Sequence, residues 1–196
     1  MCTSTEERRV PERSFFMRDP VVVAGELVGC LLVRRMAEGR IVVRITETEA
    51  YGGADDPASH AHRGPTSRNK AMFGEPGRLY VYLIYGLHHC LNIVAHEEGA
   101  AGAVLIRAGE PVEGIGLLRR NRPGVKDAAL LNGPGKLAAA LSIDRSLNGF
   151  DPIAPPIHPA PVAVIGCEAG PALERTPRIG ISAGKELPWR FIVKRP

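Results

Sequence analysis

The chain has 196 residues and a formal net charge of +4, and its length suits one domain. Hydrophobic residues make up 44% and charged residues 23%, which excludes global disorder, and no apolar run reaches the ~20 residues that cross a bilayer. The four cysteines have no metal-binding spacing, and the N-terminus lacks the apolar core of a secretion signal. We therefore expect a cytoplasmic protein with reduced thiols, no membrane contact and a basic charge that permits a polyanionic partner.

The order of apolar residues, glycines and prolines predicts a mixture of helices and strands. Residues 1–16 are expected to form a flexible tail, which leaves 17–196 as a single domain. In chain order we predict a helix over 19–30, strands over 31–35 and 40–51, a long loop over 52–78, a hairpin over 79–94 with its tip at Tyr85-Gly86, a strand over 103–107, helices over 111–122 and from 132 onward, an irregular proline-rich stretch over 151–161, and short strands over 161–166, 178–182 and 189–193. Because helices and strands do not alternate, the expected fold class is α+β, with a curved antiparallel β-sheet surrounded by helices.

The strand over 40–51 carries two carboxylates within an apolar pattern. Strand periodicity places six side chains on one face, in the order Ile41, Val43, Ile45, Glu47, Glu49 and Tyr51. A carboxylate on a buried face needs a partner, a water molecule or a chemical task. The commoner alternative is a strand that leaves the core at Thr46, with both glutamates in solvent, and the pattern alone leaves both interpretations open.

All four tyrosines lie on two of the predicted β segments. Tyr51 ends the first, while Tyr80 and Tyr82 share a face of the second and Tyr85 stands beside the turn glycine of the hairpin. An aromatic residue at an exposed tip is typical of a wedge inserted between stacked bases. Aromatic rings near a carboxylate can also stack on a base. Ordinary cross-strand aromatic packing explains the same residues without a ligand.

Histidines and basic residues gather around the same segments. His60 and His62 lie in the long loop, and His88 and His89 follow the hairpin tip; no cysteine stands at ligand spacing nearby, so we expect no metal and no other cofactor. Candidate phosphate contacts come from the loop and from a glycine-rich helix start, and they are Arg63, Arg68, Lys70 and Lys136. For each cation taken singly, a solvated surface is the commoner explanation. The glycines lack the Walker A spacing, so a nucleoside triphosphatase is not indicated.

Six segments follow one another along the chain: TETEAY, ASHAHRG, LYVYLIYG with the following CLN, VLIRAGEP, NGPGKLAAALSID and RSLNG. Together they resemble the alkyladenine (3-methyladenine) DNA glycosylase family, monofunctional enzymes of base-excision repair, and the resemblance covers about residues 17 to 195. It implies the fold predicted above, with a protruding hairpin that enters the DNA minor groove. It also implies an enzyme that flips a damaged purine out of the duplex and hydrolyses its glycosidic bond.

The resemblance also assigns roles to single residues. Glu49, the second glutamate of TETEAY, matches the general base, and Arg107 matches an arginine that helps to hold the attacking water. Tyr85 matches the tyrosine that fills the gap left by the flipped nucleotide. The implied base pocket consists of Tyr51, His60, Tyr82 and Asn92, with a backbone contact near Ile181. The implied partner is double-stranded DNA with damaged purines, such as 3-methyladenine, 7-methylguanine, hypoxanthine or ethenoadenine.

Three hypotheses compete for these residues. A DNA glycosylase uses both Glu49 and Tyr85. A damaged-DNA-binding module without chemistry would use Tyr85, but it has no use for a carboxylate that repels phosphate. A hydrolase of free nucleosides would use Glu49, but it needs no aromatic residue at an exposed tip. We favour the glycosylase, expected to act as a monomer in a bacterial cytoplasm.

Overall fold

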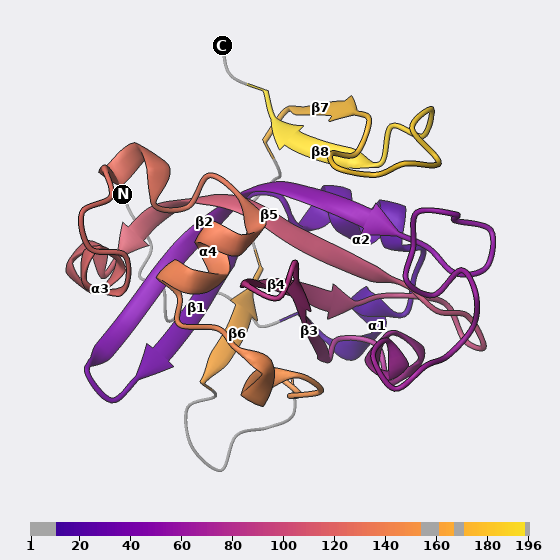
Figure 1. The fold of residues 1–196 in the computed structure, drawn as a ribbon, viewed down its shortest axis with the longest axis horizontal. Helices are drawn as coiled ribbons and strands as arrows, with labels where there is room; N and C mark the ends of the chain where they lie inside the picture. Colours follow the sequence, from indigo (N-terminus) through magenta and orange to yellow (C-terminus); the bar gives the residue numbers. More distant parts are fainter. Residues whose placement is uncertain (1–10, 154–160, 167–170, 195–196) are drawn as a thin grey trace.

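Eight strands form one curved antiparallel sheet, drawn in Figure 1 from a computed structural model that describes residues 11–153, 161–166 and 171–194. Six strands follow one another across it: β3 (Leu79–Ile84), β4 (His88–Val94), β5 (Ala103–Glu113), β2 (Gly39–Tyr51), β1 (Leu31–Met36) and β6 (Val162–Ile165). The other two are β7 (Leu173–Thr176) and β8 (Arg190–Val193), and β8 pairs with both β7 and β2. The predicted α+β class with an antiparallel sheet is confirmed.

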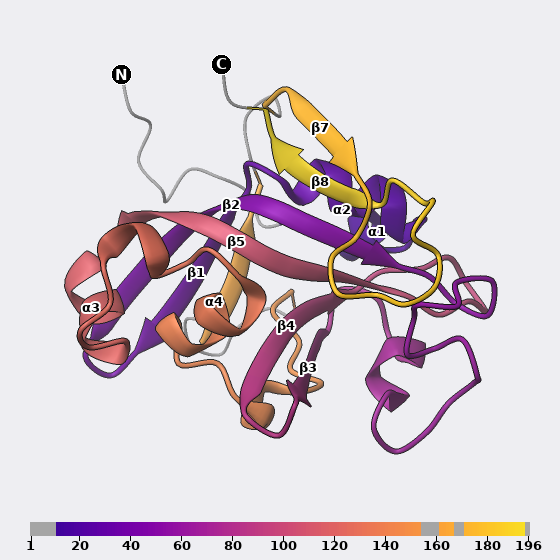
Figure 2. The ribbon, with the colours of Figure 1, turned by 45° about the horizontal axis from the view of Figure 1, so that its top comes forward.

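The long strand β2 joins the parts of this sheet. Its residues 39–44 pair with β1, its residues 47–49 pair with β8, and β5 runs along the opposite edge. Figure 2 shows the β7–β8 hairpin continuing the sheet beyond β2, while β3 and β4 lie on the far side of β5. Residues of β2 beyond 46 therefore have strand neighbours on both sides.

A bulge in β2 changes which side chains face the core. The pairing with β5 is irregular at two points between Ile45 and Thr48, and such an irregularity breaks the regular alternation of side chains along a strand. Before this irregularity the side chain of Ile45 belongs to the main core, and after it the side chain of Ala50 does. The Thr48 hydroxyl, on the same face as Ala50, donates to the carbonyl of Ala24. Glu49 and Tyr51 consequently face the other side of the sheet. The prediction of one continuous face was wrong at this point.

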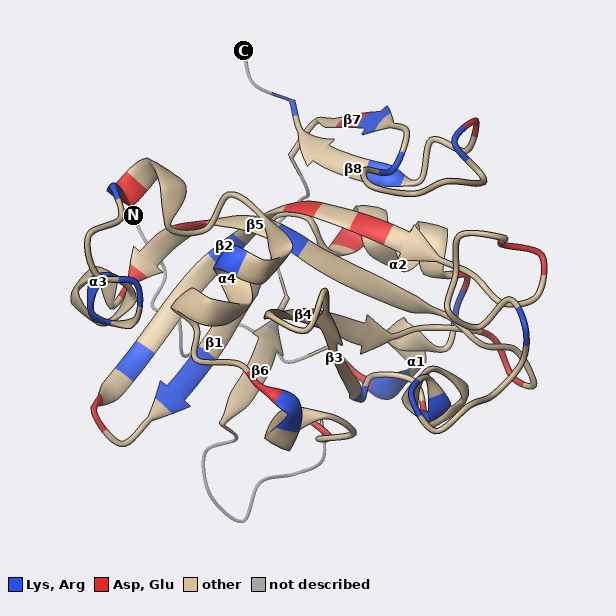
Figure 3. Cartoon of the chain, viewed as in Figure 1, with Lys and Arg blue, Asp and Glu red and all other residues tan. Residues whose placement is uncertain are grey.

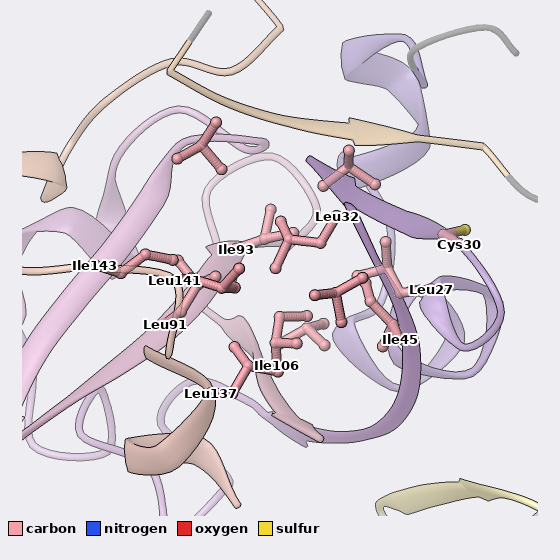
Figure 4. Close-up of a cluster of buried hydrophobic side chains, with 14 of the residues drawn as sticks. Leu27, Cys30, Leu32, Ile45, Leu91, Ile93, Ile106, Leu137, Leu141 and Ile143 are labelled. Atoms are coloured by element: carbon pink, nitrogen blue, oxygen red, sulfur yellow. The ribbon is translucent and has the colours of Figure 1, made fainter. Parts of the chain in front are cut away.

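Two helices cover the core face of the sheet. α2 (Pro20–Leu27) is capped by Asp19, whose side chain accepts from the Val21 N–H, and the helix packs against β2. α4 (Pro134–Ala140) packs against β4 and β5. Figure 4 shows the side chains that converge between them, among them Leu27, Leu32, Ile45, Leu91, Ile93, Ile106, Leu137, Leu141 and Ile143. In the described part of the chain, no helix is long and apolar enough to cross a membrane.

Several element boundaries differ from the prediction. β5 continues to Glu113 because residues 109–113 pair with β2, so the helix predicted over 111–122 begins only at Ile115, as α3 (Ile115–Asn121). The segment 178–182 is a loop, not a strand, because β7 and β2 already occupy the two edges of β8. The short 3-10 helices are η1 (Lys70–Phe73), η2 (Asp127–Ala129) and η3 (Arg145–Leu147). Most of the predicted proline-rich stretch lies outside the described residues.

Residues near the N-terminus pack more closely than a flexible tail would. α1 (Arg13–Phe16) falls within the range 1–16, yet Phe16 is buried in the main core and the Arg13 guanidinium donates to Asp151 at 2.6 Å. The packed part of the chain therefore includes α1, and residues 1–10 lie outside the described residues. Two of the four cysteines, Cys30 and Cys90, are buried.

Candidate active site

A cavity of about 190 Å³ lies on the sheet face opposite the core. The strand register places Glu49 of β2 beside Leu105 of β5, and Leu105 beside Asn92 of β4, so these three residues form one row across the sheet. Leu105 and Asn92 line the cavity. The next row faces the main core and consists of Ala50, Val104 and Ile93. The bulge in β2 is what brings Glu49 into the cavity row.

The carboxylate of Glu49 is fully buried and held by three donors. Its Oε2 accepts from the Tyr51 hydroxyl at 2.8 Å and from Arg107 Nη1 at 3.1 Å, and its Oε1 accepts from the Ile179 N–H at 2.7 Å. An ionised carboxylate only accepts hydrogen bonds and has about four acceptor positions, so three donors suit the charged form and leave one position on Oε1. Burial, followed by the charge of Glu49, raises the pKa of Tyr51, which keeps its hydroxyl a donor.

Arg107 connects Glu49 to a second carboxylate. Its Nε donates to Glu47 Oε1 at 2.7 Å, and the same oxygen accepts from Arg190 Nε at 2.6 Å. Figure 3 shows acidic residues on β2 between basic residues on β5 and β8. The alternative in which the strand leaves the core and both glutamates lie in solvent is wrong, since Glu49 is buried and Glu47 is largely covered by the two arginines.

Aromatic side chains form the walls of the cavity. Tyr51, His60 and Tyr82 all line it, as predicted for a base pocket, and so does Tyr80. The ring centres of His60 and Tyr82 are 4.7 Å apart in a T-shaped arrangement, and His60 Nδ1 lies 2.9 Å from the Tyr80 hydroxyl. Desolvation, followed by the charge of Arg68, lowers the pKa of His60, while burial raises the pKa of Tyr80 to about 12. The rings are therefore neutral at pH 7.

Tyr85 stands at the tip of the β3–β4 hairpin, where the sequence placed it. Its side chain is 83% exposed and also contributes to the cavity rim. Its φ of 52° lies in the left-handed region, which a tyrosine adopts at a cost in free energy. Because the ring is exposed, it contributes little buried apolar surface to the fold. The stability of the fold therefore does not explain an aromatic residue at this position.

Basic residues flank the cavity on two sides. A hollow of about 580 Å³ adjoins it at His60 and is lined by Arg63 and Arg68, whose guanidinium also lies 5.8 Å from the centre of the Tyr82 ring. A second hollow of about 290 Å³ adjoins the cavity at the start of α4 and is lined by Lys136. Lys70, on η1, is exposed but lines neither hollow. Three of the four predicted phosphate contacts thus lie next to the candidate pocket.

The loop between β7 and β8 closes one side of the cavity with Ile179, Gly180 and Ile181. The resemblance to the glycosylase family implied a backbone contact near Ile181. Ile181 does line the cavity, but the N–H that reaches Glu49 belongs to Ile179. Local sequence could not show this contact, because every residue except proline carries a backbone N–H and the two residues are 130 positions apart.

A buried ion pair anchors this loop. The Arg178 guanidinium donates to both carboxylate oxygens of Asp56, at 2.6 and 2.8 Å, and also to the carbonyl of Ala50. It lies over the rings of Tyr51 and Trp189, 4.8 and 5.0 Å from their centres. Burial alone would raise the pKa of Asp56, but the hydrogen bonds from Arg178 and the neighbouring amides hold it below its ordinary value. Sequence analysis did not single out either partner of this pair.

Comparisons with known proteins identify the family of this chain. The sequence model of the family described as methylpurine-DNA glycosylase (MPG) matches residues 14–196. A protein of Methanocella arvoryzae, named "Putative 3-methyladenine DNA glycosylase", is 47% identical over 189 residues, which cover 93% of this chain and 91% of that protein. A protein with the same name from Streptomyces avermitilis is 48% identical over 182 residues, which cover 91% of this chain and 85% of that protein. Another from Carboxydothermus hydrogenoformans is 46% identical over 186 residues, which cover 93% of this chain and 94% of that protein. The chain belongs to the methylpurine-DNA glycosylase family.

Proposed function

We propose that the protein flips an alkylated or deaminated purine out of duplex DNA, hydrolyses its N-glycosidic bond with an activated water and leaves an abasic site. The observation that carries this proposal is the buried carboxylate of Glu49 behind an aromatic cavity on the same sheet face. A glycosidic bond is out of reach inside the base stack, so the nucleotide must leave the stack for the reaction. The relatives, which carry the name "Putative 3-methyladenine DNA glycosylase", support the same reaction.

The contacts of Glu49 suggest how water would be activated. Its Oε1 keeps one acceptor position, which can take the proton of a water molecule that attacks C1′ of the sugar. Arg107 lines the cavity beside this carboxylate and can hold the oxygen of that water. The negative charge of Glu49 also favours the oxocarbenium-like sugar of the transition state. No lysine lines the cavity in the described part of the chain, and a water nucleophile leaves a plain abasic site.

The neutral aromatic walls suit damaged purines that carry a positive charge. A 3-methyladenine ring is cationic, so stacking on Tyr51 and Tyr82 gains cation–π attraction, and the ring is a good leaving group. Asn92 is fixed in the wall because its Nδ2 donates to the Tyr80 carbonyl at 3.0 Å. We propose that this rigid side chain crowds the 2-amino group of guanine and so disfavours undamaged guanine in the pocket.

Replacing Tyr85 by alanine is expected to weaken lesion binding much more than it changes stability. The exposed ring would fill the space left by the flipped nucleotide, and base–aromatic stacking is worth about 1–3 kcal/mol. Equilibrium binding to a duplex with one lesion, compared with the undamaged duplex, measures the effect. Val112→Ala, an exposed apolar residue on β5, is the control. An equal loss of affinity for both duplexes would rule out the wedge role.

Replacing Arg63 by glutamine is expected to reduce the salt dependence of DNA binding. If Arg63 contacts one phosphate from its hollow beside the cavity, the slope of log K against log salt should fall by about 0.9. Titrations over a range of salt concentrations measure that slope. Arg120→Gln, on the exposed side of α3, is the matched control. An unchanged slope for Arg63→Gln would remove this residue from the DNA contacts.

Base release from duplexes that carry a single lesion tests the proposed function directly. Duplexes with 3-methyladenine, hypoxanthine or 1,N6-ethenoadenine would be incubated with the protein and analysed for free base and for abasic sites. Release of base without strand cleavage supports a monofunctional glycosylase and ranks its substrates. Binding of the lesion without release from any duplex would refute the proposal and favour a damaged-DNA-binding module.

A further inference from the structure

Glu47, the other carboxylate of β2, is bonded to two arginines at the edge of the cavity. A single oxygen, Oε1, accepts from Arg107 Nε at 2.7 Å and from Arg190 Nε at 2.6 Å. All three side chains are at least four-fifths buried. These are short, charge-assisted hydrogen bonds between covered groups, so they hold the guanidinium groups in defined orientations.

The bond to Glu47 determines which edge of Arg107 meets Glu49. With Nε taken by Glu47, only Nη1 reaches the Glu49 carboxylate, at the longer distance of 3.1 Å. Nη2 makes no hydrogen bond with any described residue, and Arg107 lines the cavity. An arginine free to rotate favours a two-bond fork on a carboxylate. Such a fork on Glu49 would occupy its acceptor positions and turn Arg107 away from the cavity.

Arg190 also bonds to Glu47, although it lies closer along the strand register to Glu49. In the register of β2 with β8 it lies directly opposite Glu49, yet its guanidinium bonds to Glu47 and to the Thr176 hydroxyl. Glu47 thus attracts both arginines, and the four charged side chains sum to zero. Without Glu47, two arginines would face one carboxylate, and a net positive charge would lie beside a cationic transition state.

We propose that Glu47 is a positioning residue for base excision, which orients Arg107 toward the cavity and keeps both arginines from capturing Glu49. This role rests on the proposed glycosylase function. Glu47 acts through Arg107 and touches neither water nor substrate itself. It should therefore affect the rate of bond cleavage and not the affinity for damaged DNA.

The test is single-turnover base release by Glu47→Ala and Glu47→Gln with enzyme in excess over a lesion duplex. We expect Glu47→Ala to slow release about 10- to 100-fold, the size of effect that follows from a misplaced reacting group. Glu47→Gln keeps an acceptor oxygen for Arg107 and should lose less. Affinity for the duplex should stay close to that of the unaltered chain, and the urea midpoint shows whether each variant remains folded under the assay conditions. Glu113→Gln removes another Arg–Glu pair between the same two strands, away from the cavity, and should leave release unchanged.

The double variant separates positioning from a merely structural role. If Glu47 acts through Arg107, Glu47→Ala should cause no further loss when Arg107 is already alanine or lysine. The same fractional loss in both backgrounds would overturn the proposal, as would full activity of Glu47→Ala. If the unaltered chain releases no base, the proposed function itself fails and this role fails with it. Release by the unaltered chain that Glu47→Ala does not slow refutes this role alone.

Discussion

Replacing Glu49 by glutamine is expected to abolish base release while leaving damaged DNA bound. The amide has almost the size of the carboxylate but cannot accept a proton from water, and a general base contributes about 100- to 10,000-fold to such a step. It also removes the negative charge that stabilises the sugar cation. Glu49 is buried behind the aromatic walls, so binding of the flipped base to those walls should persist. Single-turnover release and equilibrium binding on the same lesion duplex measure both quantities.

Two controls make this result interpretable. The amide nitrogen of glutamine would face donors such as Arg107 and the Ile179 N–H, so the unfolding midpoint must show that the variant still folds. Glu110→Gln, an exposed residue on β5, tests whether loss of any glutamate on this sheet slows release. Equal turnover by Glu49→Gln and the unaltered chain would remove Glu49 from the mechanism and leave it a structural acceptor for the loop before β8.

Replacing Asp56 by asparagine is expected to lower the free energy of unfolding by about 3–5 kcal/mol. The pair with Arg178 is almost fully buried, and removal of one partner leaves a buried charge without compensation. Arg178 also supports the rings of Tyr51 and Trp189, so its displacement loosens the cavity wall. Urea unfolding followed by circular dichroism measures the change, and Asp127→Asn, an exposed partner of Arg119, should leave the midpoint nearly unchanged.

Acid should reproduce part of this loss. In the folded chain the pKa of Asp56 is below its ordinary, unfolded value. The contribution of Asp56 to the free energy of unfolding is therefore fully present above the unfolded pKa and is lost as the pH falls through the folded pKa. The unaltered chain should therefore lose more stability in this acidic range than Asp56→Asn does. If the Asp56→Asn variant were as stable as the unaltered chain at neutral pH, the ion pair would not be what anchors the loop.

The β3–β4 hairpin and the positions of its aromatic residues could be predicted from the sequence. Strand periodicity, β-forming residues and a glycine at the turn are local signals, and they placed Tyr82 on a strand and Tyr85 at the tip. The start of α2 is also determined by neighbouring residues, because Asp19 is the N-cap and Pro20 is the first residue of the helix. The six segments that resemble the glycosylase family also lie in the sequence itself, and they named Glu49 and Arg107.

Other features depend on contacts between distant parts of the chain. The bulge that moves Glu49 to the cavity face arises from the pairing of β2 with β5, and periodicity within β2 cannot show it. The strand predicted over 178–182 is a loop because β7 and β2 already occupy the two edges of β8, and that loop supplies the Ile179 N–H. The Asp56–Arg178 pair joins residues 122 positions apart.

The sequence by itself therefore determined the fold class, most of the elements and the residue types available for catalysis, because short-range preferences encode them. Only the tertiary structure decided which face each glutamate of β2 occupies, which donors surround Glu49 and which arginines bond to Glu47. These depend on strand register and on long-range packing, because a shift of one residue moves a side chain from the core face of a sheet to the opposite face.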